Sequence, residues 1–546
     1  MKVLLCTLNA KYIHTNIAIR LLYDLNKDYP GLEWKEFSIK EDLGKMSEFC
    51  SSFDIVAFSC YIWNIQQTLA LAKEIKTKKP HTQILLGGPE VSYEFNEIIE
   101  SEYIDFIISG EGEIPFSTFL GCYPEFDCVP SLIYKKGKDI IQNPSGPNFD
   151  LENYRQTNIY GHDHAETLQN RILYIETSRG CPYKCEFCLA SLDNKVRYLP
   201  MEHIKENLLW MMQKGKVIKF LDRTFNVKKA FTLEIFEFIL ENYRPQNVFQ
   251  FEITADIVHP DIIQFIKERV PKGLFRFEIG IQTIHQKANL EVQRKQNFLK
   301  TKSIILQLRD YVEMHLDLIV GLPLDHFEDI CYSINEVFAL HPPELQLGFL
   351  KLLKGTPLRD KEEHGFVFSQ SPPYSLIESK YLSKSELHQF ELLEQVLEIY
   401  WNKARAKNCL LYIETQTTIS PFLLSLGQFF SGRFSFLDAK LEDIYQIFYD
   451  YLSLHFDNPL AKELLIIDYY LHHKIRPKPW QNIEYTTERI NMTKEKGQRT
   501  INLLLRFDFL YWREHQVILE KPFLLQITYT QEQIILNETM MISSSN

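Results

Sequence analysis

The sequence predicts an α/β protein with three regions, and the spacing of its apolar residues gives the reasons. Short apolar runs alternate with helical patterns over residues 1–140, which predicts a doubly wound parallel sheet. The alternation recurs six times over residues 172–355, and a mostly helical pattern rich in aromatic residues follows residue 375. We therefore expect domains over 1–140, 171–375 and 376–546. Residues 141–170 are expected to be a linker, because residues 143–147 read Asn-Pro-Ser-Gly-Pro.

The composition is that of a globular protein with several domains. The chain has 546 residues, more than one ordinary domain holds, and 45% of them are hydrophobic and 24% charged. The net charge of -11 argues against a nucleic-acid binder that relies on global charge, so nucleic acid is not an expected partner. Ten cysteines are too few for a disulfide scaffold. We expect a cytoplasmic protein with no membrane partner, since no apolar run has the length of a signal peptide or a membrane span.

In the first region, glycines and a serine follow the predicted strands. Strands are expected over 3–8, 55–62, 84–86 and 106–108, with a helix over 65–78. The second strand ends in Ser59-Cys-Tyr61, Gly87 and Gly88 follow the third strand, and Gly110 follows the fourth. Ligands of doubly wound sheets bind at the carboxyl ends of the strands, where glycine lets the backbone approach a bulky ligand. These loops predict a ligand site, although such a sheet also occurs as a scaffold without a cofactor.

Three cysteines stand close together near the start of the second region. Cys181, Cys185 and Cys188 are spaced C-x3-C-x2-C after a strand-like run over 172–176. Thiolates at these separations can converge on one metal centre, and three ligands on a cubane cluster leave one iron open to a substrate or cofactor. A zinc site with His203 as its fourth ligand is an alternative. A redox pair of Cys185 and Cys188 is another, but it does not account for Cys181.

The cysteine motif, with the aromatic Phe187 before its last cysteine, resembles the signature of the radical S-adenosylmethionine (SAM) enzymes. The resemblance implies a [4Fe-4S] cluster whose open iron chelates SAM and cleaves it to a 5'-deoxyadenosyl radical, with Phe187 near the adenine. It also implies a core shaped as a partial (β/α)6 TIM barrel, which the six predicted strand–helix units fit. An electron donor such as flavodoxin or ferredoxin is implied as a partner.

Polar residues follow the predicted strands of this core. The strands are expected over 172–177, 217–221, 249–253, 275–281, 316–320 and 345–350. Residues at the carboxyl ends of barrel strands form active sites. Asp222, Glu252 and Glu278 are candidates for the amino group and ribose hydroxyls of SAM, and Arg223 is the candidate for its carboxylate. Salt bridges within the barrel are the alternative role of each residue. The Gly-Gly-Glu turn common in the family is replaced here by Leu-Asp-Arg at 221–223.

The strand-end loops of the first region, placed ahead of the cysteine motif, resemble the cobalamin-binding domain of B12-dependent radical SAM enzymes. The resemblance implies a Rossmann-like domain in which Ser59, Gly87 and Gly88 flank the nucleotide tail of cobalamin, with Gly110 as a further contact. Many such domains carry Asp-x-His-x-x-Gly after the first strand, and residues 11–16 lack its Asp and Gly. His14 is therefore a candidate cobalt ligand, but base-off cobalamin without a protein histidine is the expected state.

The two resemblances together imply a B12-dependent radical SAM enzyme, and methyl transfer to an unactivated carbon or phosphorus centre is the expected reaction. The substrate is expected to be a small molecule or natural product, which the sequence does not identify. A cobalamin-assisted rearrangement and a methylthiotransferase acting on tRNA are the alternatives. The latter needs a second cysteine triad, for which Cys6, Cys50 and Cys60 are the candidates, and packing explains Cys6 and Cys60. An iron–sulfur sensor or scaffold is the non-enzymatic alternative.

The third region is expected to be an accessory domain, similar to the family-specific C-terminal domains of cobalamin radical SAM proteins. An amphipathic helix over 385–407, capped near Ser383, precedes helical patterns near 441–455 and 461–472. Residues 476–480, Arg-Pro-Lys-Pro-Trp, interrupt the helices. An apolar run at 517–519 and an alternating pattern at 525–529 predict a small sheet.

Overall fold

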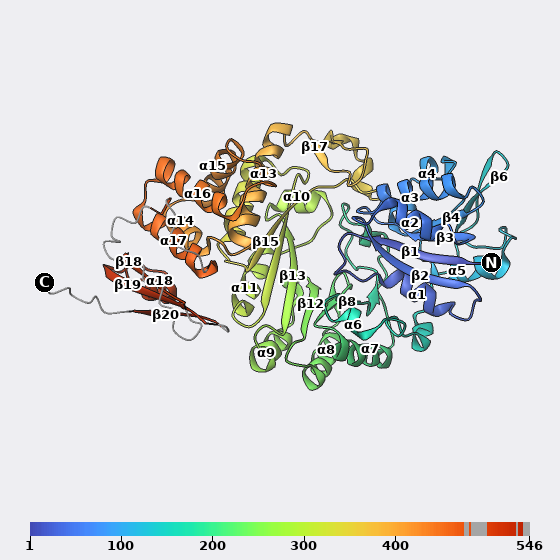
Figure 1. Ribbon diagram of the computed structural model, residues 1–546, viewed down its shortest axis with the longest axis horizontal. Coiled ribbons are helices and arrows are strands. Elements are labelled where there is room, and N and C mark those ends of the chain that lie inside the picture. The colour runs from blue at the N-terminus through green and yellow to red at the C-terminus, as the bar shows by residue number, and fades with distance from the viewer. Residues whose placement is uncertain (474–479, 482–498, 531–532, 539–546) are drawn as a thin grey trace. The chain divides into compact units, whose positions relative to one another are not determined.

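A computed structural model describes residues 1–473, 480–481, 499–530 and 533–538 (Figure 1). The chain divides into two units. The first comprises Met1–Asp325 and Gly348–Leu382, and the second comprises His326–Leu347 and the chain from Ser383 onward. None of the helices in the described ranges has the length and apolar composition that a bilayer crossing requires.

The N-terminal part of the first unit is built on a seven-stranded sheet with the order β2-β1-β3-β4-β5-β6-β7. Its first five strands are parallel and its last two antiparallel. The strands are β1 Val3–Asn9, β2 Leu32–Ser38, β3 Ile55–Ser59, β4 Gln83–Gly87, β5 Phe106–Ile108, β6 Leu132–Lys136 and β7 Asp139–Gln142. The doubly wound fold class is confirmed. Strands β2, β6 and β7 were not expected. The edge strands β2 and β7 bury few apolar residues, and only Leu32 and Phe37 of β2 are buried. Strand β6 lies inside the sheet, but its buried run is only three residues long, Leu132 to Tyr134.

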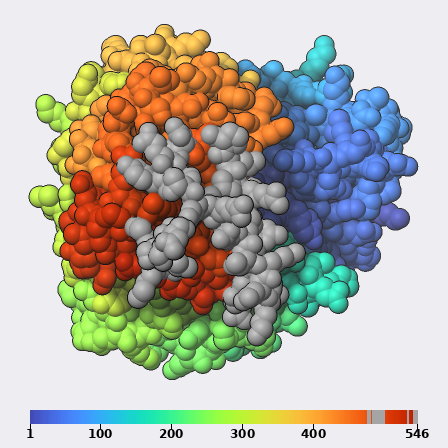
Figure 2. Space-filling model, turned by 60° about the vertical axis from the view of Figure 1, so that its left-hand side comes forward, coloured from blue at the N-terminus to red at the C-terminus, as the bar shows by residue number. Residues whose placement is uncertain are grey.

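Helices cover both faces of this sheet. They are α1 Ile17–Leu25, α2 Leu43–Cys50, α3 Ile65–Lys78, α4 Asn96–Glu100 and α5 Glu113–Cys122. Alternate residues of each central strand point to opposite faces, so one apolar cluster forms with α2, α3 and α4, and another with α1 and α5. In the space-filling view, the N-terminal residues, coloured blue, form one contiguous body (Figure 2). This packing places the ends of β1, β3, β4 and β5 along one edge of the sheet.

A second sheet has six strands in the order β15-β14-β13-β12-β11-β8, which is the sequence order of an open barrel. The strands are β8 Ile172–Ile175, β11 Val217–Phe220, β12 Val248–Ile253, β13 Phe275–Gln282, β14 Glu313–Val320 and β15 Glu344–Phe349. The helices between them include α7 Met201–Lys214, α8 Lys229–Asn242, α9 Pro260–Arg269, α10 Gln286–Glu291, α11 Phe298–Leu308 and α12 Phe327–Phe338. The predicted partial (β/α)6 barrel is thus confirmed as the fold of the core.

Strands β12, β13 and β14 alternate strictly between buried apolar residues and partly exposed residues. The buried set packs toward the helices, and the partly exposed set includes Gln250, Glu252, Glu278, Gln282 and Asp317. Because side chains alternate across a strand, these polar groups share one face of the sheet. That face lines a cavity instead of a packed apolar core.

Between the two sheets, the chain is partly helical. A 3-10 helix, Leu151–Gln156, and the short helix α6, Ala165–Leu168, lie within the predicted linker, and β7 extends to Gln142. The segment at 143–150 has no regular structure, as its prolines and glycine lead one to expect. The boundaries at 140, 170 and 375 stay predictions.

The second unit is mostly helical, as expected. Its helices after residue 383 are α13 Lys384–Leu397, α14 Lys407–Gln416, α15 Ile419–Ser431, α16 Leu441–Tyr451, α17 Pro459–His472 and α18 Phe509–His515. Ser383 caps α13 in a capping box with Glu386, as its position suggested. The helix expected to run to 407 ends at Leu397 and continues as a π-helical turn, Glu398–Asn402. Asn402 fixes this turn by donating to Leu345 O and accepting from Leu345 N.

The small sheet of the second unit is formed by β18 Arg499–Phe507, β19 Glu520–Tyr529 and β20 Ile534–Glu538. The alternating residues 525–529 lie in β19, as predicted. Residues 517–519 lie before β19 and form no strand, because β18 and β20 provide the antiparallel neighbours instead. The predicted interruption at 476–480 falls on residues outside the described ranges, except for Trp480.

Candidate cofactor-binding site

The three cysteines of the motif line one cavity of about 250 Å³, which we call the cysteine cavity. The loop that carries them starts and ends in a two-residue antiparallel ladder between β9, Ser178–Arg179, and β10, Arg197–Tyr198. Gly180 follows β9 with a φ of +90°, and a Cβ there would lie 2.6 Å from the carbonyl oxygen of Lys195. The tight start of the loop therefore requires glycine.

The donor set of this cavity suits a metal centre with three thiolate ligands. Cys181 and Cys185 are buried and Cys188 is partly exposed. Burial raises the pKa of the Cys185 thiol, while the guanidinium of Arg294, 3.7 Å from its sulfur, acts in the opposite direction. His203, the zinc ligand considered above, does not line the cavity. It is buried on α7, where its Nε2 accepts a hydrogen bond of 2.8 Å from Asn207.

Four of the five residues predicted to contact SAM line the cysteine cavity: Phe187, Arg223, Glu252 and Glu278. Glu278 is bound by Lys219, whose ammonium lies 2.7 Å from both carboxylate oxygens, so it also has the alternative salt-bridge role. Burial raises the pKa of Glu252, and the nearby Arg223 lowers it in part.

The fifth predicted residue, Asp222, is not among the residues that line this cavity. It is 1% exposed and accepts hydrogen bonds from the Thr177 hydroxyl at 2.7 Å, the Ser178 hydroxyl at 2.5 Å and the Thr177 amide at 3.2 Å. Burial raises its pKa to about 6, while these hydrogen bonds favour the ionised form. Asp222 therefore ties the end of β11 to the chain that leads from β8 into the cysteine loop.

Two charged lining residues were missed by the sequence analysis, Arg294 and Asp317. Arg294 donates to the carbonyl of Gly280 and lies in the loop between α10 and α11, so no strand-end pattern marks it. Asp317 lies on β14, whose alternation of apolar and polar residues was the available signal. Gln282 ends β13 at a register shift and has a φ of +67°, which turns the chain at the cavity.

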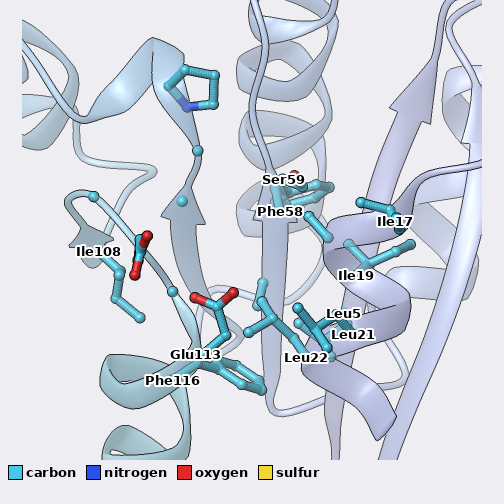
Figure 3. Close-up of a pocket in the computed structure, with 18 of the residues that line it drawn as sticks. Leu5, Ile17, Ile19, Leu21, Leu22, Phe58, Ser59, Ile108, Glu113 and Phe116 are labelled. Atoms are coloured by element: carbon cyan, nitrogen blue, oxygen red, sulfur yellow. The ribbon is translucent and has the colours of Figure 1, made fainter. Parts of the chain in front are cut away.

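A second cavity, of about 270 Å³, lies at the edge of the N-terminal sheet, and we call it the apolar cavity. Leu5, Ile19, Leu22, Phe58 and Phe116 are among its lining residues (Figure 3). Ser59, Gly87, Gly88 and Gly110, the predicted cobalamin contacts, all line it as well.

Gly88 is the most restricted of these contacts. Its φ is +106°, and a Cβ would lie 2.5 Å from the carbonyl oxygen of Cys60. Gly110 also has a positive φ, +81°, but a Cβ there meets nothing within 4 Å. A Cβ at Gly87 would make only an ordinary contact, 3.9 Å from the carbonyl oxygen of Ile108. The site thus offers an apolar wall and an open stretch of backbone, which suits a large ligand recognised by its shape.

A third cavity, of about 700 Å³, adjoins both of the others, and we call it the middle cavity. It shares Ile17, Tyr61, Pro89, Glu176 and Arg179 with the apolar cavity. It shares Ala190 and Arg223 with the cysteine cavity. The three cavities are therefore neighbours within the first unit.

His14, the candidate cobalt ligand, lines the middle cavity. Its Nδ1 lies 2.8 Å from the hydroxyl of Tyr174. Burial, with the nearby positive charge of Lys11, lowers the pKa of His14, so its imidazole is neutral at pH 7. No carboxylate orients the ring through a hydrogen bond in the described structure. Residues 11–16 contain no acidic partner for His14, and in the described structure no distant carboxylate takes that place.

The cysteines considered for a second triad, Cys6, Cys50 and Cys60, are fully buried in the apolar cluster formed with α2, α3 and α4. None of them lines the three cavities described above. Burial raises the pKa of Cys6 and of Cys60, which disfavours their thiolate forms. Packing in the core accounts for these three residues.

The fold and these cavities define an α/β protein in which a doubly wound domain and an open (β/α)6 barrel share one series of cofactor-sized cavities. Comparison with protein families agrees. Residues 175–337 match the radical SAM superfamily and residues 40–120 match the B12 binding domain. Residues 362–498 match a family described as a protein of unknown function, DUF4080. The chain therefore contains a B12-binding domain and a radical SAM domain.

Individual relatives point to the same group. The cobalamin-dependent radical SAM methyltransferase TokK of Streptomyces tokunonensis is 26% identical over 171 residues, 29% of this chain and 25% of TokK. The hopanoid C-3 methylase of Methylococcus capsulatus is 26% identical over 45% of this chain and 49% of its own length. The chain thus spans a quarter to a half of these relatives. The structure of OxsB with aqua-cobalamin bound superposes with a TM-score of 0.60 at 14% identity, covering 86% of this chain and 80% of OxsB.

Proposed function

We propose that the protein is a B12-dependent radical SAM methyltransferase that acts on a small molecule or natural product. The observation that carries this proposal is the adjacency of the three cavities, in which the middle cavity shares lining residues with both the apolar and the cysteine cavity. A methyl donor and a radical source must meet one substrate, and neighbouring cavities bring the two cofactor sites close to one another. The radical SAM and B12-binding domains, with relatives named as methyltransferases, support the same reaction.

In this proposal the cysteine cavity holds a [4Fe-4S] cluster and SAM. Cys181, Cys185 and Cys188 hold the cluster, and their number leaves one iron for SAM. Arg223 and Arg294 are the cations available to the SAM carboxylate, because both line the cavity. Glu252 is the carboxylate offered to its amino group or ribose. When bound, the cluster supplies the electron that cleaves SAM, and cobalamin carries the methyl group.

The apolar cavity holds the nucleotide tail of cobalamin in the same proposal. Ser59, Gly87, Gly88 and Gly110 border it, and the side chains shown in Figure 3 exclude water from the tail. The middle cavity then takes the corrin ring and the substrate. A flavodoxin or ferredoxin is the proposed electron donor, and the cytoplasm is the proposed location, since the thiols must remain reduced.

The function is tested on the full chain after anaerobic reconstitution with iron and sulfide. We expect about four irons per chain, bound corrinoid, and reductant-dependent formation of 5'-deoxyadenosine or methylated product from SAM. A protein that binds no corrinoid contradicts the proposal. About eight irons per chain would favour a methylthiotransferase with a second cluster, and an intact cluster without SAM cleavage would favour a sensor.

A further inference from the structure

The base of the cysteine loop carries two arginines that face each other. In the ladder between β9 and β10, Arg179 pairs in register with Arg197. Arg179 precedes Cys181 by two residues, and Arg197 lies where the loop ends. Both arginines therefore lie on the backbone ladder from which the loop with the three thiols starts and to which it returns.

Both arginines bind carboxylates of the loop that follows β5 in the N-terminal sheet. Arg179 Nη2 lies 2.5 Å from Glu113 Oε1, and Arg179 Nη1 lies 3.3 Å from Glu111 Oε1. Arg197 also forms an ion pair with Glu111. We call these four residues, Arg179, Arg197, Glu111 and Glu113, the arginine clamp. It joins the base of the cysteine loop to the rim of the apolar cavity, since Glu111 and Glu113 both line that cavity.

The clamp is largely shielded from water. The side chains of Arg179 and Glu113 are 14% and 6% exposed. Burial would raise the pKa of Glu111, but its hydrogen bond to Arg197 and the charge of Arg179 lower it below its usual range. Glu113 begins α5, where the helix dipole favours a negative charge. Removing Arg179 would leave the buried carboxylate of Glu113 without this ion pair, whereas removing Glu113 leaves Arg179 paired with Glu111 and Glu176.

The clamp is completed by contacts that hold Arg179 in one orientation. Arg179 Nε lies 2.9 Å from Glu176 Oε1, and its Nη2 donates to the hydroxyl of Tyr154 at 2.6 Å. Arg179 and Glu176 line both the apolar and the middle cavity. The same guanidinium therefore borders the space proposed for cobalamin and fixes the start of the loop proposed to hold the cluster.

We propose that the arginine clamp couples the two cofactors, so that cobalamin in the apolar cavity orders the cysteine loop and a bound cluster orders the cavity rim. The four residues are positioning residues, and the inference rests on the cofactors of the proposed function. Coupling between two sites is reciprocal, so each cofactor strengthens the binding of the other by the same factor. Loss of the clamp leaves both sites present but independent.

The test measures the dissociation constant of hydroxocobalamin for the full chain, before and after cluster reconstitution. In the wild type we expect binding about tenfold tighter with the cluster, within the usual range of coupling between sites. Arg179→Gln and Glu113→Gln should each reduce this ratio to about one, and the double variant should reduce it no further, because one interaction is lost in all three. Retention of iron against a chelator, with and without cobalamin, gives the reciprocal measurement.

Arg359→Gln is the matched control. Arg359 Nε lies 2.9 Å from Glu94 Oε1, an ion pair to the same N-terminal domain that does not involve the cysteine loop. This variant should keep the wild-type ratio. Equal cobalamin affinity with and without the cluster in the wild type, or a ratio preserved in Arg179→Gln, overturns the inference. If Arg179→Gln does not fold, the ratio of cobalamin dissociation constants measured in Glu113→Gln decides whether the inference holds. A wild type that binds no cobalamin contradicts the proposed function instead.

Discussion

The apolar cavity and the cysteine cavity lie in the same unit but are built in different ways. The apolar cavity is bounded mostly by aliphatic and aromatic side chains and by glycine backbone, with Gly88 in a conformation that excludes a Cβ, and charged residues of the arginine clamp line only part of it. The cysteine cavity is bounded by thiols, guanidinium groups and carboxylates on the polar face of β11–β14 and the loops around it. The first kind of site recognises shape, and the second recognises donor atoms. We therefore expect that adding a side-chain atom to the apolar cavity weakens ligand binding there. In the cysteine cavity, we expect that removing a donor atom weakens binding.

The largest effect is expected from removing a thiol. Cys181→Ala, Cys185→Ala and Cys188→Ala should each abolish cluster absorbance after anaerobic reconstitution, because two thiolates cannot replace the three-ligand set. Iron content and the visible spectrum measure this. Cys122→Ala and Cys331→Ala, which change cysteines outside the cavity, should leave the cluster intact. A full cluster in any of the three motif variants would show that the ligand set is wrong.

Adding a side chain at Gly88 should give the next largest effect. Gly88→Val places a Cβ against the carbonyl of Cys60 and strains the backbone, so cobalamin affinity should fall about tenfold or more, given the roughly 1–3 kcal/mol that such strain costs. Equilibrium dialysis against hydroxocobalamin measures the change. Gly87→Ala, with only a 3.9 Å contact, should have a smaller effect, and Gly121→Ala in α5, which meets nothing within 4 Å, should have none. Equal losses of cobalamin affinity in all three variants would contradict the inference that the apolar cavity recognises the shape of its ligand.

A smaller effect, a loss of SAM affinity, is expected from removing one cation of the cysteine cavity. Arg294→Gln should weaken SAM binding about tenfold if Arg294 binds the SAM carboxylate, since a hydrogen bond to a charged group contributes about 1.5–3 kcal/mol. Isothermal titration of the reconstituted protein with SAM measures this. Arg223→Gln is the paired variant, because both residues line the cavity. Comparable SAM affinity in both variants and the wild type would exclude the two guanidinium groups as carboxylate partners.

Asp222 should produce a modest dependence of stability on pH. Its pKa is raised from 3.8 to about 6 in the folded protein, so the folded state binds more protons than the unfolded state between these values. The contribution of this group to the free energy of unfolding therefore falls as pH rises from about 4 to about 6, and is constant above that range. Urea unfolding of wild type and Asp222→Asn at several pH values should show this fall in the difference between their free energies of unfolding. A parallel dependence in both proteins would contradict the raised pKa.

The smallest expected effect is that of His14→Ala on bound cob(II)alamin. The His14 ring bonds a tyrosine hydroxyl instead of a carboxylate, so it lacks the partner that usually orients a metal-bound imidazole. We expect base-off cobalamin, whose electron paramagnetic resonance lines are not split into triplets by an axial nitrogen. The variant should give the same spectrum. Triplets that disappear in His14→Ala would identify His14 as the ligand, and triplets that persist would mean that the tail base stays bound to cobalt.

The parts of this site that were predicted from the sequence are those whose chemistry is local in the chain. Cys181, Cys185 and Cys188 lie within eight residues and need one loop to converge, and Gly88 directly follows an apolar strand. Arg294 was missed because its neighbour Cys185 is 109 residues away, and only the barrel brings them together. Asp222 was assigned to SAM from its strand-end position, but the direction of its side chain depends on hydrogen bonds to Thr177 and Ser178.

Prediction of the strands and helices from the sequence has the same limit, because local patterns are visible in the chain and distant contacts are not. Central strands such as β1 and β3 bury nearly every residue and so appear as apolar runs, whereas the edge strand β2 mixes buried and exposed positions without a clear alternation. The predicted helix over 385–407 had the correct capping box, but its end depends on the pairing of Asn402 with Leu345, a residue more than fifty positions earlier. Local patterns identify how elements start and which face they bury. Where they stop is decided by distant partners.

The hydrogen bond from the Thr177 amide to Asp222 has a consequence for how quickly parts of the cysteine loop open. A buried amide with a buried carboxylate as its acceptor exchanges its proton with solvent only when the local structure opens. We therefore expect the Thr177 amide, at the root of the loop, to exchange slowly. Because the thiols lie beyond Gly180, we also expect metal loading to leave this hydrogen bond and strand β8 in place.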